Sequence, residues 1–332
     1  MLDPKAKLSR KVFSKDIDQV PTRNGYGEGL VLAGKKNPNV VALCADLTES
    51  TRTEAFKKEF PDRFIQIGVA EQLLATVAAG MANYGKIPFI SSYAAFSPGR
   101  NWEQIRTTVA LNEVPVKIAG AHAGISVGPD GATHQMLEDI ALMRAMPKMT
   151  VVYPGDSIEA RKATLAAASY DGGVYLRFAR EKTAVFTTDK SPFKIGQAEV
   201  LWQSKEPQVA IVGCGPLVHE ALLAAHELEK AGTGSIVINN HTIKPMDEHT
   251  IIRAARTCGA VVTVEEHQIN GGMGSAVAEV LTRNWPTPIE YIGMPNHFGE
   301  SGAPDELLEK YGMKAKNIVA AAKKVIARKV KD

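Results

Sequence analysis

Short apolar runs alternate along this chain with longer segments of helical periodicity, and this alternation constrains the fold more than any other feature. The runs cover residues 40–43, 64–67, 88–90, 116–119, 151–153 and 174–177, then 208–212, 235–238 and 260–264. Helices are predicted over residues 102–111, 157–168, 217–231, 247–257 and 275–282. Strands that are buried on both faces read as continuous apolar runs. The pattern therefore predicts an α/β fold with mostly parallel sheets that are flanked by helices.

The series of apolar runs is interrupted near the middle of the chain. Residues 182–194 are polar and contain Ser191-Pro192, which is typical of a linker. A second series of runs begins after it, and 332 residues are enough for two cores. We therefore predict two α/β domains, at residues 1–190 and 191–332.

Composition and charge exclude several classes of protein. A formal net charge of +3 is too small to indicate a nucleic-acid partner. The three cysteines, Cys44, Cys214 and Cys258, are too far apart to indicate a disulfide framework or a zinc site. No apolar run is long enough to span a membrane, and residues 1–20 lack the apolar core of a signal peptide. The cytoplasm is the expected location.

An acidic residue follows the second apolar run directly. The run ends near Gly68, and Glu71 then opens a predicted helix. An acid in the first turn of a helix is favourable in itself, because it complements the helix dipole. Junctions between strand and helix in parallel sheets are also where ligands bind. Both interpretations of Glu71 stay open on spacing alone.

Two further segments carry candidate functional side chains. Tyr93 and Phe96 follow the run at 88–90, where they could be core aromatics or stack on a ligand. Residues 119–135 contain four glycines, which predict an irregular loop, together with His122, Asp130 and His134. Two histidines without further nearby ligands are a weak basis for a metal site, and no metal ligands are predicted.

Residues 67–72 and 119–135 resemble two motifs of the transketolase family of thiamine-diphosphate enzymes. The first is similar to the family's glycine-x-alanine-glutamate-glutamine motif, and the second to its loop that ends in aspartate-glycine-x-threonine-histidine-glutamine. The resemblance extends from about residue 20 to 325. It covers the pyrimidine-binding and C-terminal domains of the family, which are only half of its architecture.

This resemblance implies roles for the residues around Glu71. Glu71 would donate a hydrogen bond to N1′ of the cofactor's pyrimidine, which favours the imino tautomer that deprotonates thiazolium C2. Phe96 would stack on the pyrimidine with Tyr93 beside it. Gly99 stands where the family usually has a further aromatic residue.

The resemblance also implies substrate contacts. His122 and His134 would contact hydroxyl or carbonyl oxygens at the reacting carbons of a sugar, and Asp130 a neighbouring hydroxyl. At the sugar-phosphate end the resemblance implies Arg23, Ser50 and Arg180. It implies Asp46 on the cofactor side, and Arg100 is a further candidate without a firm counterpart in the family. For Ser50 and Arg180, a surface or capping role is an equal alternative. Arginine suits phosphate because its planar fork pairs with two oxygens.

The family's motif for Mg²⁺ and diphosphate, glycine-aspartate-glycine followed by a distant asparagine, is missing from the chain. The resemblance therefore implies an N-terminal partner subunit that carries the diphosphate and Mg²⁺ site, in an assembly of two copies of each subunit. The cofactors would be thiamine diphosphate and Mg²⁺, with the metal held by the partner.

The activity implied is transfer of a two-carbon ketol group from a ketose phosphate to an aldose phosphate, with pentose phosphates as the default sugars. Alternatives are a subunit similar to deoxyxylulose-phosphate synthase, a β-type subunit of a 2-oxo-acid dehydrogenase, and a non-catalytic scaffold subunit. His122 and residues 125–128 favour transketolase over the other two enzymes. In the second half, residues 213–216 only superficially resemble a dinucleotide loop, and His267 is expected to pack or cap.

Overall fold

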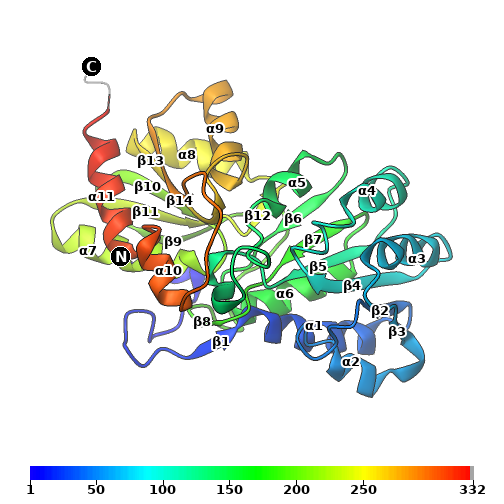
Figure 1. The fold of residues 1–332 in the computed structure, drawn as a ribbon. Coiled ribbons are helices and arrows are strands. Elements are labelled where there is room, and N and C mark those ends of the chain that lie inside the picture. The colour runs from blue at the N-terminus through cyan, green and yellow to red at the C-terminus, as the bar shows by residue number, and fades with distance from the viewer. Residues whose placement is uncertain (330–332) are drawn as a thin grey trace.

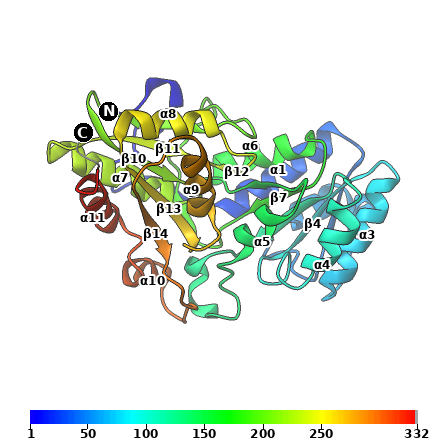
Figure 2. The same cartoon turned by 90° about the horizontal axis from the view of Figure 1, so that it is seen from above.

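A computed structural model describes residues 1–329 of the chain, which form two α/β units that lie side by side (Figures 1 and 2). Each unit is built on its own sheet, and each sheet is mostly parallel. The predicted fold class is confirmed. No helix within these residues is long and apolar enough to cross a membrane.

The first sheet has seven strands in the order β12-β6-β7-β5-β4-β2-β3. Their bounds are β2 (Val40–Cys44), β3 (Phe64–Gln66), β4 (Ile87–Tyr93), β5 (Lys117–Ala121), β6 (Thr150–Val152), β7 (Val174–Arg177) and β12 (Thr242–Lys244). The last of these comes from the second half of the chain and pairs antiparallel with β6. Neither β12 nor its place in the first sheet was predicted, because three residues are too few to give a periodic signal.

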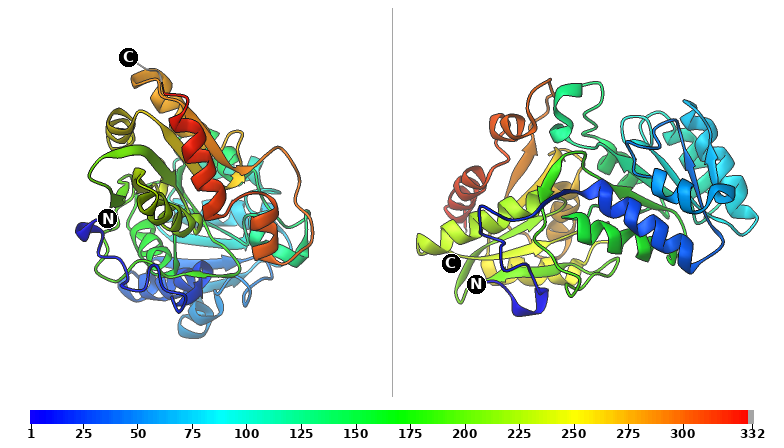
Figure 3. Two further views of the ribbon diagram at one scale, coloured as in Figure 1. Left: turned by 90° about the vertical axis from the view of Figure 1, so that its left-hand side faces the viewer. Right: turned by 90° about the horizontal axis from the view of Figure 1, so that it is seen from below.

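Alternate residues of each strand enter separate cores, as the pleat requires. Val41 and Leu43 pack on one face with α3 (Glu71–Asn83) and α5 (Asp139–Ala145). Val40 and Ala42 pack on the other face with α1 (Thr22–Lys36) and α6 (Ser157–Ala168), which run next to each other (Figure 3). This double burial explains why the strands read as continuous apolar runs.

The second sheet has five strands in the order β14-β13-β10-β11-β9. Their bounds are β9 (Glu199–Gln203), β10 (Pro207–Gly213), β11 (Gly234–Asn239), β13 (Val261–Gln268) and β14 (Ile289–Met294). Helices α7 (Leu217–Lys230) and α11 (Ala315–Ile326) contribute to the core on one face. Helices α8 (Glu248–Cys258) and α9 (Met273–Asn284) contribute to the core on the other, which is continuous with a core of the first unit.

Two segments differ from the prediction. The helix predicted over 102–111 is a short α4 (Trp102–Gln104) that continues as a π-helix over Ile105–Ala110. The segment predicted as a linker contains β8 (Lys182–Ala184), which pairs antiparallel with β1 (Gln19–Pro21). This strand was not predicted because strands were predicted from apolar runs, and its residues are mostly polar.

The start of the chain lies on the second unit. The backbone N–H groups of Asp3 and Gln203 donate to the carbonyls of Leu201 and Met1, both at 2.9 Å, so the first residues extend the edge at β9. Figure 3 shows this segment crossing beneath the second unit before α1 begins. The start of the chain on the second unit, and β12 in the first sheet, therefore join the two units.

Candidate active site

The residues singled out in the first unit lie at one edge of its sheet. Glu71, Tyr93, His122 and Arg180 follow β3, β4, β5 and β7, and these strands run parallel. Carboxyl ends of parallel strands meet at the same edge, which is where ligands bind in such sheets. The fold thus brings residues that are more than a hundred positions apart in sequence to one edge.

Glu71 opens α3 and is buried, with 2% of its surface exposed. Gly68 makes the turn before it with φ +84°, a conformation that other residues rarely adopt. Nη1 of Arg100 donates to Glu71 Oε2 at 2.9 Å, and Nδ2 of Asn101 donates to the Glu71 carbonyl at 2.9 Å. Both donors lie on the segment between β4 and α4: Arg100 contacts the carboxylate, and Asn101 holds the backbone at the start of α3.

Four rings form a cluster that Arg100 connects to this carboxylate. Tyr93 stacks on His122 with ring centroids 3.9 Å apart, and Phe96 meets His134 edge to face at 5.4 Å. The guanidinium of Arg100 lies 4.9 Å from the centroid of the Phe96 ring. The end of β4 and the loop at 119–135 are therefore in direct contact, and both aromatic residues face this loop rather than the core.

Arg23 connects the first turn of α1 to the same cluster. Its Nη1 donates to the carbonyl of Ser50 at 2.9 Å and lies 3.2 Å from Nε2 of His122. Because arginine only donates, Nε2 of His122 must accept, and the ring is neutral with its proton on Nδ1. Burial lowers the pKa of His122 to about 3, and the positive charges of Arg23 and Arg180 lower it further in the same direction. His122 is accordingly uncharged at neutral pH.

Asp130 and Arg180 form an ion pair, with Oδ1 and Nη1 2.9 Å apart. Arg180 also donates to the carbonyl of Val127 at 3.2 Å, which fastens the loop at 125–130 to the end of the first unit. Asp46 lies further away. It follows β2 with φ +58°, its N–H donates to Gln66 Oε1 at 3.0 Å, and its side chain is exposed. Within residues 1–329, no hydrogen bond joins the Asp46 carboxylate to the other residues singled out.

A buried ion pair, called the buried joint below, was not predicted from the sequence. Asp139 and Arg177 are fully buried, with Oδ2 and Nε 2.7 Å apart, and Tyr175 donates to the same oxygen at 2.6 Å. Burial alone would raise the pKa of Asp139, but the Arg177 guanidinium holds it below its usual range. Arg177 Nη2 also donates to the carbonyls of Met136 and Glu266, at 3.2 and 3.0 Å.

The second unit also holds the loop at residues 119–135, called the histidine loop below, through two further hydrogen bonds. Glu266 Oε1 accepts from the N–H of Ser126 at 2.6 Å, and Gln135 donates to the carbonyl of Glu300 at 2.8 Å. Burial raises the pKa of Glu266. The one signal in the sequence was a charged residue, Arg177, at the end of an apolar run, which indicates a buried partner without naming it.

Comparison with known proteins assigns the family. Residues 18–185 match the family described as "Transketolase, pyrimidine binding domain", and residues 196–318 match "Transketolase, C-terminal domain". The chain belongs to the transketolase family. A putative transketolase C-terminal section of Methanocaldococcus jannaschii is 44% identical over 93% of this chain and 96% of its own length.

Two other transketolase relatives are similar over nearly all of the chain. A 6-deoxy-6-sulfo-D-fructose transketolase subunit of Clostridium is 40% identical over 96% of this chain and 98% of its own length. The solved structure of a split-gene transketolase, described as an inactive β4 tetramer, is 43% identical, has a TM-score of 0.87, and is matched over 94% of this chain and all of its own. Against human transketolase, which is 37% identical, the chain spans 94% of itself but only 50% of the relative.

Transketolases depend on thiamine diphosphate, so the fit of this site to that cofactor can be tested on its residues. A buried carboxylate at Glu71, the adjacent ring of Phe96, and the Ser92 hydroxyl, which is buried without a partner in the part of the chain described, suit a flat heterocycle with polar edges. Within residues 1–329, no group of three or more histidine, cysteine, aspartate or glutamate side chains could hold a metal ion. The side chains named here suit the pyrimidine end of the cofactor.

Proposed function

We propose that this chain is the C-terminal subunit of a two-subunit transketolase that moves a two-carbon ketol group from a ketose phosphate to an aldose phosphate. The observation that carries the proposal is Glu71, a buried carboxylate that accepts from Arg100, whose guanidinium also lies over the ring of Phe96. The domains proposed are residues 1–190 for the pyrimidine and 191–332 for the C-terminal domain. The relatives are transketolases, which disfavours the synthase, dehydrogenase and scaffold alternatives.

In this proposal the chain's residues bind and orient. Thiamine diphosphate, when bound, supplies the nucleophilic carbon that carbon–carbon cleavage beside a ketone requires. Glu71 holds a proton toward the pyrimidine, and Phe96 fixes the plane of that ring by stacking. His134 and the neutral His122 orient the sugar's oxygens, and Arg23 and Arg180 bind the terminal phosphate.

A partner subunit is part of the proposal. We propose that an N-terminal subunit supplies the diphosphate and Mg²⁺ site, and that two copies of each chain assemble. The absence of a metal-binding cluster within residues 1–329 supports this. The description of the similar split-gene chain as an inactive β4 tetramer also supports it, since that assembly contains one kind of chain.

The test is reconstitution. The purified chain, the N-terminal subunit and their mixture are assayed for transfer from xylulose 5-phosphate to ribose 5-phosphate with thiamine diphosphate and Mg²⁺, and their masses are measured in solution. We expect turnover only in the mixture, at the mass of two copies of each chain. Decarboxylation of pyruvate without ketol transfer would instead indicate one of the other enzyme types.

A matched variant tests the residue that carries the proposal. Glu71→Gln keeps the shape and the Arg100 contact site but removes the carboxylate, so we expect turnover to fall at least a hundredfold while the mixture keeps its mass. A variant with undiminished turnover would show that Glu71 does not activate the cofactor. The sugars need a panel of donors, because one relative is named for a sulfonated rather than a phosphorylated sugar.

A further inference from the structure

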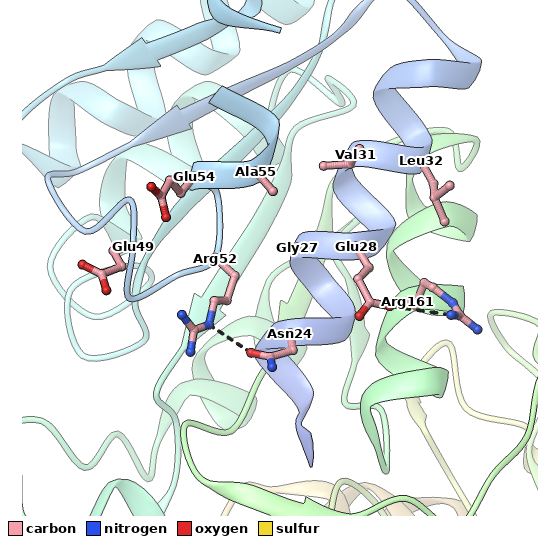
Figure 4. A pocket seen from close by; sticks show the side chains of 10 residues that line it. All are labelled: Asn24, Gly27, Glu28, Val31, Leu32, Glu49, Arg52, Glu54, Ala55 and Arg161. Atoms are coloured by element: carbon pink, nitrogen blue, oxygen red, sulfur yellow. Dashed lines mark hydrogen bonds and ion pairs between the residues drawn. The ribbon is translucent and has the colours of Figure 1, made fainter. Parts of the chain in front are cut away.

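Three guanidinium groups, those of Arg23, Arg52 and Arg180, gather around the start of α1. Sequence reasoning singled out the first and third but not Arg52, which lies in the turn between β2 and α2 (Glu54–Glu59). Its backbone has φ +63°, and Nε donates to Asn24 Oδ1 at 2.9 Å. Figure 4 shows the Arg52 side chain extending from this turn to Asn24 at the first turn of α1.

Two hydrogen bonds join this turn to α1. Arg23 donates to the carbonyl of Ser50, and Arg52 donates to the side chain of the next residue along α1, Asn24. The two arginines are therefore crossed between the same pair of segments. Since Nε of Arg52 is occupied by Asn24, its two Nη groups remain as the donors that a ligand can use.

Two of the three guanidinium groups lack a carboxylate partner in the part of the chain described. Within residues 1–329, no carboxylate lies within ion-pair distance of Arg23 or Arg52, whereas Arg180 pairs with Asp130. Burial lowers the pKa of Arg23, and the charges of Arg52 and Arg180 lower it further, so the three groups are close enough to repel. Like charges held together without a counter-charge destabilise a fold, unless an anion binds between them.

Two buried nitrogen donors without a partner also favour a bound anion. Nε of Arg23 and Nδ1 of His122 are buried, and neither has a partner within the described residues. A hollow of about 760 Å³ begins at Asn24 and Arg52 and runs along α1 as far as Arg161 (Figure 4). Arg52 therefore stands between the site at the sheet edge and an open surface hollow.

We propose that Arg52 is a third guanidinium of the subsite for the tetrahedral oxyanion at the far end of the sugar, and that it sets the affinity for that group. The proposal rests on the proposed function, because it needs a sugar substrate with a terminal anion. Arginine pairs two oxygens of such a group at once, and a dianion is better matched by three cations than by two. Phosphate and sulfonate share this chemistry.

The first test compares donors in the reconstituted complex. For Arg52→Gln, we expect the KM for xylulose 5-phosphate to rise about tenfold, as for loss of one charge-assisted contact, while kcat stays within about twofold. The KM for erythrulose, a ketol donor without a terminal anion, is expected to stay the same. Arg52→Lys should recover part of the loss. An equal rise with both donors would mean that Arg52 only supports the turn, and would overturn the proposal.

The matched control is Arg161→Gln. Arg161 lines the other end of the same hollow and is paired with Glu28 and Asp189, so the change removes the same charge from the same surface. We expect it to leave both KM values unchanged. A control that raises the KM for xylulose 5-phosphate as much as Arg52→Gln does would show a general effect of surface charge and overturn the proposal.

A comparison with a ketol donor that carries a terminal sulfonate tests which anion the subsite binds. Larger loss on the phosphorylated donor in Arg52→Gln assigns the subsite to phosphate, and larger loss on the sulfonated donor assigns it to sulfonate. Loss on neither overturns the role of Arg52.

A binding measurement separates this inference from the proposed function. The chain alone is titrated with inorganic phosphate by calorimetry, in the wild type, Arg52→Gln and Arg161→Gln. Weaker binding confined to Arg52→Gln supports the subsite even where the complex shows no ketol transfer. Equal binding in all three proteins overturns the subsite even where transfer is confirmed.

Discussion

Nη1 of Arg100 lies 2.9 Å from Oε2 of Glu71, and the same guanidinium covers the ring of Phe96. In this contact Glu71 accepts a hydrogen bond and Arg100 donates it. The role proposed for Glu71 requires a proton directed at the pyrimidine, so the cofactor and Arg100 compete for this side chain. Arg100 is half exposed and can swing away, whereas Glu71 is fixed.

This competition gives the first prediction. In the reconstituted complex, Arg100→Gln should lower the half-saturating concentration of thiamine diphosphate severalfold, because Glu71 no longer has to leave an ion pair. The free energy of unfolding should change by less than about 1 kcal/mol, since one partner of the pair is half exposed. Cofactor titration and urea unfolding measure the two quantities. Weaker cofactor binding in the variant would show that Arg100 assists Glu71 instead.

The second prediction concerns the buried joint of Asp139 and Arg177. Asp139→Asn removes one charge from a pair that is entirely shielded from water, so we expect the free energy of unfolding to fall by about 3–5 kcal/mol in urea. Lys58→Gln is the control, because Lys58 and Glu54 form an exposed pair and should contribute less than about 1 kcal/mol. Similar losses in the two variants would mean that the joint is not a buried charge pair.

The third prediction tests how Glu266 holds the histidine loop. A Cβ at Gly124 would lie 2.3 Å from Glu266 Oε1, and φ there is +95°. Gly124→Ala should therefore lower the free energy of unfolding by about 1–3 kcal/mol and reduce ketol transfer. Gly80→Ala is the control, because its Cβ would meet no atom within 4 Å in α3 and should stabilise the helix by about 0.5–1 kcal/mol. A loop that tolerates Gly124→Ala in both assays would contradict this account.

The fourth prediction is a pH dependence of stability. Burial, and then the charge of Asp156, raise the pKa of Glu159 to about 8 from an ordinary value near 4.5. The folded chain keeps a proton that the unfolded chain releases between these values. The stability that this proton contributes is fully present below pH 4.5 and is lost as the pH rises through about 8. Asn239 Nδ2 and the Gly155 N–H donate to this carboxyl.

Urea unfolding at several pH values between 5 and 9 measures this effect. Glu159→Gln cannot release a proton, so the decline in its free energy of unfolding with rising pH should be shallower than in the wild type. Glu113→Gln, which changes an exposed side chain, should keep the wild-type slope. Parallel slopes in all three proteins would show that Glu159 is ionised in the fold.

The sequence predicted those features that depend on local pattern. Every apolar run proposed as a strand is one, since burial on both faces leaves a continuous signal, and Glu71 opens its helix as expected. The roles of the site residues remain predictions.

The features that were missed depend on long-range contacts between side chains. Arg177 and Asp139 are 38 positions apart in the sequence, and the spacing of the two residues does not indicate that they pair. Arg52 looked like one surface arginine among many, because its position beside Arg23 depends on a turn with positive φ. Such contacts require three-dimensional coordinates.

The edge strand β12 has a consequence for how the molecule is made. Thr242–Lys244 completes the first sheet beside β6, although more than sixty residues separate it from β7, the preceding strand of that sheet. During synthesis the pyrimidine-binding half emerges first, and the edge of β6 stays unpaired until β12 has been made. An unpaired strand edge can pair with another chain. A fragment that ended near residue 190 would lack β12 and leave the edge of β6 open to pairing with other chains.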